Sequence, residues 1–403
     1  MLTALLLFCL LGVSCTPGRD FNTSLSSIVK PYRFYIAQWE VNTIFSKTKQ
    51  FIFDRNKKVD NDINQVNEFF AIVDRLKTLK SEIEAIKTDK KQGDLTSLEA
   101  KFDELQQKRA ALNEVVEKII SRQIREALNE QSIFNPIEKY IKLKVNFPPI
   151  EFKLDKPPHL LIVSPRDRIE RIREIVLLQE VSVEETERIE DKVDELGVSS
   201  LVVTLGGFGG TYPTFVTNEA SLRFTVDAAV EEWLHQYLTF KPLGFRYILD
   251  LTGISRNYEI AIMNETVASM VSKEIGALIS QKYYPESKNN SSQPQRTSSG
   301  FDFNQEMREI RRAVDQYLAR GEIEQAEEFM EQKRQFLVSK GYYIRKLNQA
   351  YFAFYGTYAD SLTSISPIGV ELKALREKSA SLKEFLETAA AMNSRQDLTQ
   401  SLE

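Results

Sequence analysis

The sequence predicts an α+β protein that is mainly helical. Apolar residues recur every three to four positions through the proline-free stretch 59–132, and again through most of the chain after residue 220. This is the spacing of amphipathic helices. Between these regions, short β-branched segments bounded by proline and glycine at 148–216 have the pattern of a small sheet.

The composition excludes several classes of chemistry. The chain has 403 residues, with 53 Lys and Arg against 57 Asp and Glu, so a formal net charge of −4 gives no global attraction to nucleic acid. Both cysteines, Cys9 and Cys15, lie near the N-terminus, which leaves the body without a disulfide or a thiolate metal site. With only His159 and His235, one chain cannot form a three-histidine metal site.

Residues 1–14 have the features of a signal peptide of the lipoprotein type. The apolar run at residues 2–13 is too short to span about 30 Å of hydrocarbon as a helix. The sequence Gly12-Val13-Ser14-Cys15 resembles a bacterial lipobox, which is cleaved before its cysteine so that the thiol can be acylated. We therefore expect lipidation at Cys15 and an extracytoplasmic protein that is lipid-anchored to a bacterial membrane. The alternatives are an ordinary signal peptide and a buried N-terminal helix.

A long helical hairpin is expected to follow an N-terminal segment. Residues 15–58 form that segment, in which the aromatic-rich stretch 34–53 is expected to be helical. Residues 59–132 carry two helical apolar stripes around Lys91-Gln92-Gly93, which predicts an antiparallel hairpin arm. Thr96-Ser97-Leu98-Glu99 has the pattern of a capping box for the second helix.

Strands are expected only in the next part of the chain. Candidate strands are 150–155, 159–164, 200–205 and 211–216, with a charged helix capped by Ser182 between the second and third. Four glycines at 206–210 lack the spacing of a phosphate-binding loop, so they predict a tight turn or backbone left open for a ligand.

The rest of the chain is expected to be helical up to a polar tail at 393–403. A polar loop is expected at 287–300, and Asn264 is interpreted as the cap of a helix that runs past Ile275. The other helices are expected at 223–240, 303–319, 322–338, 341–356 and 370–391.

One group of residues has the pattern of a metal site. Glu231 and His235 lie four positions apart on one face of the 223–240 helix, with Glu232 about 100° round it. This is the geometry of H-E-x-x-H, in which two histidines bind zinc and the glutamate is the general base. Here Glu231 stands at the first ligand position, and Glu265 lies 30 residues after His235. On its own, such a Glu-to-His pair is more often a solvated ion pair on a helix surface.

Several segments resemble an uncharacterised family of bacterial proteins. They are VEEWLHQYL, PLGFRY, NETVASMVSKEIG, IRKLNQAYFAFYG, SPRDRIE, GGFGGTYPTF and IEQAEEFMEQKR, which cover most of the chain from about 146 to 376. That family is in turn similar to gluzincin metallopeptidases of the thermolysin type. The resemblance implies a zincin-like domain over 143–392, with a small sheet and an active-site helix. In such folds the edge strand and loop matching 201–216 lie beside the substrate and can hold a peptide by β-augmentation.

The resemblance also implies roles for single residues. His235 and Glu265 match metal ligands, Glu232 matches the general base, and Glu231 occupies a ligand position with a different residue type. A carboxylate can bind zinc, and carboxylate-rich sites favour harder divalent ions, so the cofactor is expected to be zinc or another divalent metal. Tyr351, Tyr355 and Tyr358 are spaced i, i+4 and i+7, which is typical of core packing. One of them, with Tyr351 named first, or Arg345 is a further candidate, as an oxyanion donor.

Three functions therefore stay open at the level of the sequence. The first is a membrane-anchored metallopeptidase that acts on a peptide or protein. The second is an inactive pseudopeptidase that binds peptides or acts as a scaffold in the cell envelope. The third is a structural envelope protein whose helical arm makes the contacts.

Overall fold

The computed structural model describes residues 19–34, 63–88, 93–138, 144–285 and 301–403. The protein is mainly helical, with 63% helix and small sheets, so the predicted α+β class is confirmed. The expected signal peptide, Cys15 and the loop at 287–300 lie outside the described residues, as does nearly all of the stretch 34–53. No described helix is both long and apolar enough to cross a membrane.

The larger of the two sheets is antiparallel, in the order β3-β2-β4, and its central strand is almost entirely buried. The strand candidates at 159–164 and 200–205 are confirmed, whereas β3 was not expected from the sequence. The strands are β2 (His159–Pro165), β3 (Arg173–Leu177) and β4 (Val198–Thr204).

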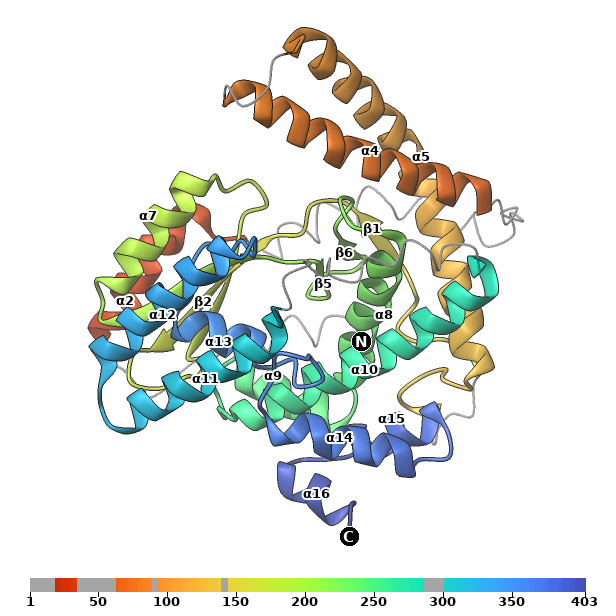
Figure 1. Cartoon of the computed structure of the whole chain (residues 1–403). Helices are drawn as coiled ribbons and strands as arrows, with labels where there is room; N and C mark the ends of the chain where they lie inside the picture. Colours follow the sequence, from red (N-terminus) through yellow and green to blue (C-terminus); the bar gives the residue numbers. More distant parts are fainter. Residues whose placement is uncertain (1–18, 35–62, 89–92, 139–143, 286–300) are drawn as a thin grey trace.

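Two helices cover one face of this sheet. Apolar residues of α2 (Arg19–Val29) and α7 (Val183–Asp194) pack on it (Figure 1). Ser182 and Glu185 form the predicted capping box of α7. After α2, the short helix η2 (Lys30–Tyr32) leads to Arg33, which pairs with β3.

The smaller sheet lies beside the helix that carries the candidate site. Its order is β1-β6-β5, with β1 parallel and β5 antiparallel to β6. The strands are β1 (Phe152–Leu154), β5 (Gly207–Phe208) and β6 (Thr214–Val216). The short strand β5 places the glycine-rich segment against α8 (Leu222–Leu238).

The centre of the molecule is the pair α8 and α10 (Tyr258–Tyr283), which share the main apolar core. The sequence places the start of α10 at Asn264, but Asn257 caps it through the backbone N–H of Ile260. Asn264 is instead buried inside the helix. The chain between α8 and α10 forms α9 (Pro242–Leu251), a helix that was not expected.

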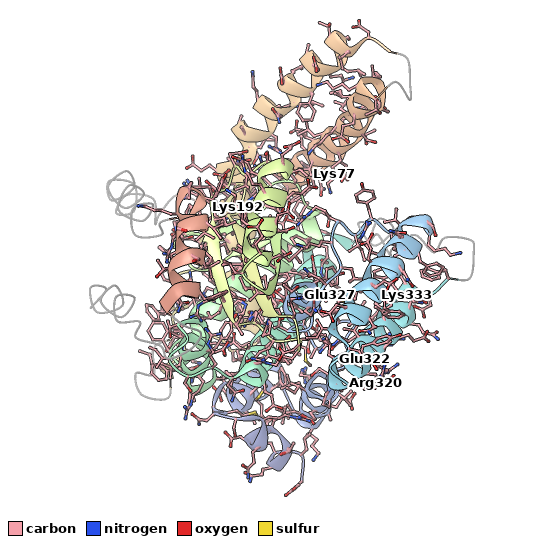
Figure 2. The ribbon with its side chains drawn as sticks, turned by 90° about the vertical axis from the view of Figure 1, so that its left-hand side faces the viewer. Lys77, Lys192, Arg320, Glu322, Glu327 and Lys333 are labelled. Carbon is pink, nitrogen blue, oxygen red and sulfur yellow. The ribbon has the colours of Figure 1, made fainter. Side chains whose placement is uncertain are left out.

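The helical hairpin is confirmed, and it projects from the body in both views (Figures 1 and 2). It consists of α4 (Ile63–Lys87) and α5 (Leu95–Glu130). The expected capping box is wrong, because Asp94 caps α5 by accepting from the N–H of Ser97. The hairpin is not a separate arm throughout, since both helices contribute to the main apolar core.

Among the described residues the C-terminal part contains helices and no strand, and three of its expected elements differ from the structure. The expected helix 341–356 is helical only over Gln349–Tyr355, because residues 341–348 form no helix. Helices α11 (Phe303–Ala319) and α12 (Ile323–Ser339) lie on one side of the body in Figure 2, and the turn between them carries an ion pair between Arg320 and Glu322. The expected helix 370–391 is two helices, broken at Ser379–Ser381. The expected tail contains α16, whose Leu398 is fully buried. The helices are α11 (Phe303–Ala319), α12 (Ile323–Ser339), α13 (Gln349–Tyr355), α14 (Pro367–Lys378), α15 (Leu382–Ala390) and α16 (Arg395–Gln400).

Candidate metal centre

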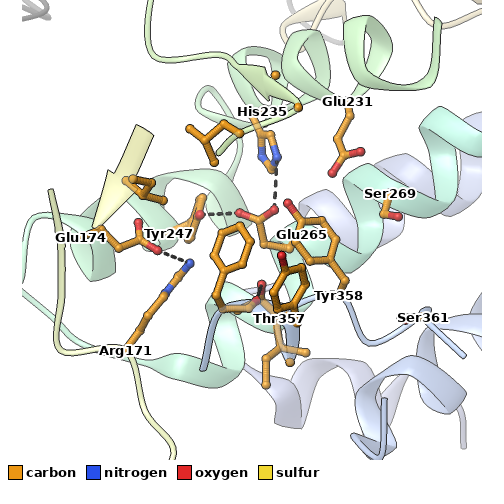
Figure 3. Close-up of a pocket in the computed structure, with 18 of the residues that line it drawn as sticks. Arg171, Glu174, Glu231, His235, Tyr247, Glu265, Ser269, Thr357, Tyr358 and Ser361 are labelled. Carbon is orange, nitrogen blue, oxygen red and sulfur yellow. Dashed lines mark hydrogen bonds and ion pairs between the residues drawn. The ribbon is translucent and has the colours of Figure 1, made fainter. Parts of the chain in front are cut away.

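A cavity of about 1040 Å³ lies between the glycine-rich loop and helices α8, α9, α10 and α13 (Figure 3). Its lining combines a cluster of charged side chains with apolar and aromatic ones. The charged part contains Glu231, Glu232, His235 and Glu265. The pocket therefore brings together all four residues that the sequence pattern singles out.

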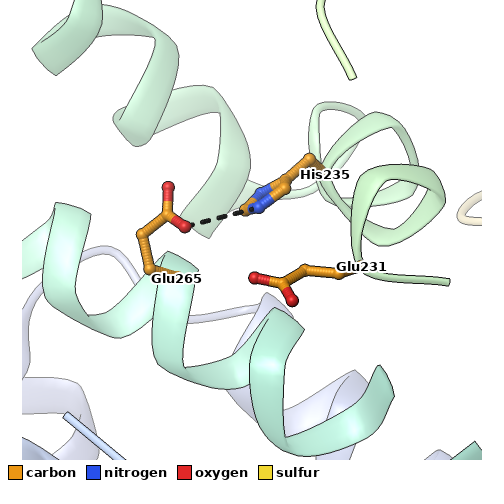
Figure 4. Close-up of side chains that lie close together, drawn as sticks. All are labelled: Glu231, His235 and Glu265. Atoms are coloured by element: carbon orange, nitrogen blue, oxygen red, sulfur yellow. Dashed lines mark ion pairs between the residues drawn. The ribbon is translucent and has the colours of Figure 1, made fainter. Parts of the chain in front are cut away.

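Three of these side chains converge from two helices (Figure 4). Glu231 and His235 project from the same face of α8, and Glu265 faces them from the second turn of α10. One ligand atom of each lies within 4.8 Å of the others. Glu232 is not part of this group of three.

The imidazole of His235 has a fixed orientation. Its Nδ1 lies 2.9 Å from Oδ1 of Asn264, and its Nε2 lies 3.5 Å from Oε2 of Glu265. An amide oxygen only accepts hydrogen bonds, so Nδ1 carries the donated proton. Nε2 is thus the ring nitrogen that faces the two carboxylates. Metal-binding histidines use the same arrangement, in which the second ring nitrogen donates to an outer partner.

The three groups also perturb one another's protonation. Burial raises the pKa of Glu231 to about 8, although the nearby His235 opposes the shift. Burial would lower the pKa of His235, but Glu265 and its neighbouring carboxylates raise it to about 10. Burial would likewise raise the pKa of Glu265, yet His235 lowers it to about 2. The carboxyl groups around the imidazole thus favour a positive charge at this position.

The donor set fits a divalent metal ion. One imidazole nitrogen and two carboxylate oxygens are ligand types that bind zinc at about 2.0–2.2 Å. Three donor atoms within 4.8 Å of one another can reach one ion with small side-chain movements. His235, Glu265 and Glu231 would hold the ion, and Asn264 would orient the histidine.

Glu232 lies beside this group, under the glycine-rich loop. A Cβ atom on Gly207 would lie 2.4 Å from its Oε1, and one on Gly209 would lie 2.7 Å from its Oε2. Gln236 holds the loop on α8 through the carbonyls of Gly209 and Thr211. The expectation of a tight turn is therefore refined: these glycines allow the backbone to approach the carboxylate of Glu232. Burial raises the pKa of Glu232 to about 7.

Sequence reasoning missed the residues behind Glu265. The hydroxyl of Tyr247 on α9 donates to Oε1 of Glu265. Arg171 lies over the Tyr247 ring, 5.8 Å from its centroid, and its guanidinium lies 2.5 Å from the carboxylate of Glu174 (Figure 3). Tyr247 belongs to the PLGFRY segment, and α9, a helix that was not expected, turns its side chain into the pocket. No sequence pattern indicated this orientation.

The tyrosines of α13 and of the segment after it reach the pocket in different ways. Tyr351, Tyr355 and Tyr358 all line the pocket, and Tyr358 lies beside Glu265 in Figure 3. Burial raises the pKa of Tyr358 well above 10, so its hydroxyl keeps its proton as a donor. Thr266 fixes the segment before and after Tyr358, by donating to the carbonyl of Thr357 and accepting from the N–H of Ala359.

Arg345, the other oxyanion candidate, does not lie in this pocket. Its guanidinium binds both oxygens of Glu190, a carboxylate only 2% exposed, and donates to the carbonyl of Val202. A carboxylate so deeply buried needs a cationic partner, which explains the position of Arg345. The prediction for this residue is therefore wrong.

The same contacts close part of the sheet edge that was expected to hold a peptide. The N–H of Val202 donates to the carboxylate of Glu190, and the carbonyl of Val202 accepts from Arg345. The carbonyl of Ser200 accepts from Asn348. These backbone groups of β4 are already paired, so they are not available for β-augmentation. The expectation of a free edge is wrong for Ser200–Val202.

Comparison with known proteins gave no relatives: no protein-family model, curated protein or solved structure matches the chain.

Proposed function

We propose that this chain is a membrane-anchored, gluzincin-like metallopeptidase that hydrolyses peptide bonds in its pocket. One observation carries the proposal: Glu231, His235 and Glu265 converge from α8 and α10, with one ligand atom of each within 4.8 Å of the others. The size of the cavity, about 1040 Å³, and its apolar lining are compatible with a peptide side chain beside the charged group.

The chain's own groups divide the proposed reaction among them. His235, Glu265 and Glu231 hold the divalent ion, which supplies Lewis acidity when bound. Glu232 accepts a proton from the attacking water and passes it to the nitrogen of the breaking C–N bond. Burial raises the pKa of Glu232 to about 7 in the metal-free pocket, and a bound cation nearby would lower it, which keeps the carboxylate ionised to accept the proton. Tyr358 donates a hydrogen bond to the oxyanion that forms on the carbonyl oxygen.

Glu231 sets the expected character of the ion. Two carboxylates neutralise a divalent charge, so the site polarises a carbonyl less than one with two histidines and a single carboxylate. Carboxylate-rich ligand sets also accept harder ions, which makes manganese a candidate beside zinc.

A second candidate is a pseudopeptidase that binds peptides without cleaving them. The position of Glu232 favours it, because Gly207 and Gly209 lie against both oxygens of this carboxylate. A base covered in this way has less access to a water molecule. In this case the pocket would serve recognition or scaffolding alone.

The two candidates differ in turnover. The full-length protein, loaded with zinc or manganese, is incubated with a peptide library and cleavage is followed by mass spectrometry. We expect cleavage by the native protein and its loss in Glu232→Gln, with metal content unchanged. Metal binding without cleavage by the native protein supports the pseudopeptidase. Metal and cleavage only in Glu231→His would identify an enzyme inactivated by that residue.

Membrane attachment is proposed through a lipid on Cys15. Two acyl chains give stable attachment where one chain gives only reversible binding. Labelled palmitate should enter the native protein in bacterial cells but not a Cys15→Ala variant. Equal labelling of both would exclude acylation at this residue.

A further inference from the structure

The carboxylate of Glu265 has two oxygens in different surroundings. Oε1 accepts the hydrogen bond from the hydroxyl of Tyr247, and Oε2 lies 3.5 Å from Nε2 of His235 (Figure 3). The phenol engages one lone pair of Oε1 and holds this oxygen toward α9. Only Oε2 faces the donor atoms of α8.

The position of Tyr247 is itself strongly fixed. Gly244, one turn earlier in α9, packs so closely that an added Cβ would lie 2.1 Å from the carbonyl oxygen of Leu238 in α8. On its other side, the ring meets the guanidinium of Arg171, whose side chain is only 5% exposed. The packing of Gly244 fixes α9 against the end of α8, and Arg171 covers one face of the tyrosine ring.

Arg171 is in turn held by two carboxylates. Its guanidinium lies 2.5 Å from Glu174 and 3.6 Å from Asp250, the latter on α9. Asp250 also accepts from the N–H of Asn257, the cap of α10. Asp250 thus joins the end of α9, the helix that carries Tyr247, to the start of α10, the helix that carries Glu265.

We propose that Tyr247 is a positioning residue that makes Glu265 a one-oxygen ligand and so biases the site toward zinc over harder divalent ions. This inference rests on the proposed metal site. Zinc favours four ligands, whereas ions that take more oxygen ligands gain from a carboxylate that binds through both oxygens. Holding Oε1 toward Tyr247 reduces that advantage for the harder ions.

The test uses Tyr247→Phe in the full-length protein, with cobalt, zinc and manganese as the metals. The control is Tyr258→Phe, which removes another pocket tyrosine hydroxyl, one that donates to the carbonyl of Ala353 and not to Glu265. Competitive titration gives the dissociation constants, and the visible absorption of bound cobalt reports the coordination number. Circular dichroism checks that each variant is folded.

We expect Tyr247→Phe to weaken zinc binding by about 10- to 100-fold, the usual cost of losing an outer hydrogen bond to a ligand. Manganese binding should change less, and the cobalt absorption should weaken as the freed Oε1 adds a ligand. The control should change neither. The same cobalt spectrum and zinc-to-manganese ratio in native protein and Tyr247→Phe would overturn the inference while leaving the metal site intact.

Two further outcomes are decisive. If the native protein binds none of the three ions, the proposed function fails and the inference fails with it. If Tyr247→Phe does not fold, X-ray absorption on the native zinc-loaded protein replaces the variant. Glu265 bound to zinc through one oxygen then supports the inference, and binding through two oxygens overturns it.

Discussion

The contact between the glycine-rich loop and Glu232 gives a prediction whose size follows from the structure. A methyl group at position 207 would lie 2.4 Å from Oε1 of Glu232, about 1 Å short of ordinary van der Waals contact. It would also lie 2.8 Å from Cγ, so rotating the carboxylate alone does not relieve the clash. Gly207→Ala must therefore displace either the loop or the whole side chain.

Overpacking of this kind costs about 1–3 kcal/mol. We expect Gly207→Ala to lower the free energy of unfolding by that amount, as measured by urea denaturation of the metal-free protein. In a Glu232→Ala background the clash has no partner, so the same substitution should cost close to nothing. The double-mutant cycle should thus show a coupling of about 1–3 kcal/mol. Metal affinity should stay unchanged because Glu232 is not a ligand.

Gly210→Ala is the matched control, since its added Cβ would meet the ring of Phe208, not Glu232. Its cost should be the same in both backgrounds. If the cost of Gly207→Ala is equally independent of Glu232, the loop does not lie on this carboxylate. The inference that the loop limits the access of water to Glu232 would then be refuted.

Three further predictions concern the surroundings of the site. Asn264→Ala removes the acceptor 2.9 Å from Nδ1 of His235 and should weaken metal binding about 10- to 100-fold in a chelator competition. Gly244→Ala should destabilise the protein by about 1–3 kcal/mol in urea, because its Cβ would lie 2.1 Å from the carbonyl oxygen of Leu238. Glu231, with its pKa raised by burial to about 8, must lose its proton to act as a ligand. Apparent metal affinity should therefore rise as the pH rises toward 8, with protons released in calorimetry.

Each of these has a clear contrary result. Unchanged metal affinity in Asn264→Ala would mean that His235 is not oriented by this amide. Stabilisation by Gly244→Ala, the usual effect of about 1 kcal/mol in an open helix, would mean that α9 does not pack on α8 as described. Metal binding without proton release at pH 6 would exclude Glu231 and His235 as ligands that are protonated in the free site.

The sequence predicted the elements well where periodicity is strong. The hairpin, the buried strands β2 and β4, and helix α8 follow directly from the spacing of their apolar residues. Helix α9 was missed because it is only 10 residues long and begins with Pro-Leu-Gly. The start of α10 was misplaced because Asn257 and Asn264 are equally good caps by residue type, and only tertiary packing buries Asn264.

The site was predictable in part for a similar reason. Glu231 and His235 are related by helical geometry, which the sequence contains. Tyr247 and Arg171 reach the pocket through α9 and through the turn before β3, and neither path has a sequence pattern. Arg345 was misassigned because its partner, Glu190, lies 155 residues away in the chain and is recognisable only once α7 is placed against β4.

The central claim is that Glu231, His235 and Glu265 bind one divalent metal ion. The most direct test is metal analysis of the full-length protein after equilibration with zinc and removal of excess ion. The variant is His235→Ala, and the control is His159→Ala, whose half-buried ring lies on β2 outside the pocket. We predict one divalent ion per chain in the native protein and the control, and none in His235→Ala. A native protein that keeps no ion, or a His235→Ala variant that keeps as much, would contradict the account.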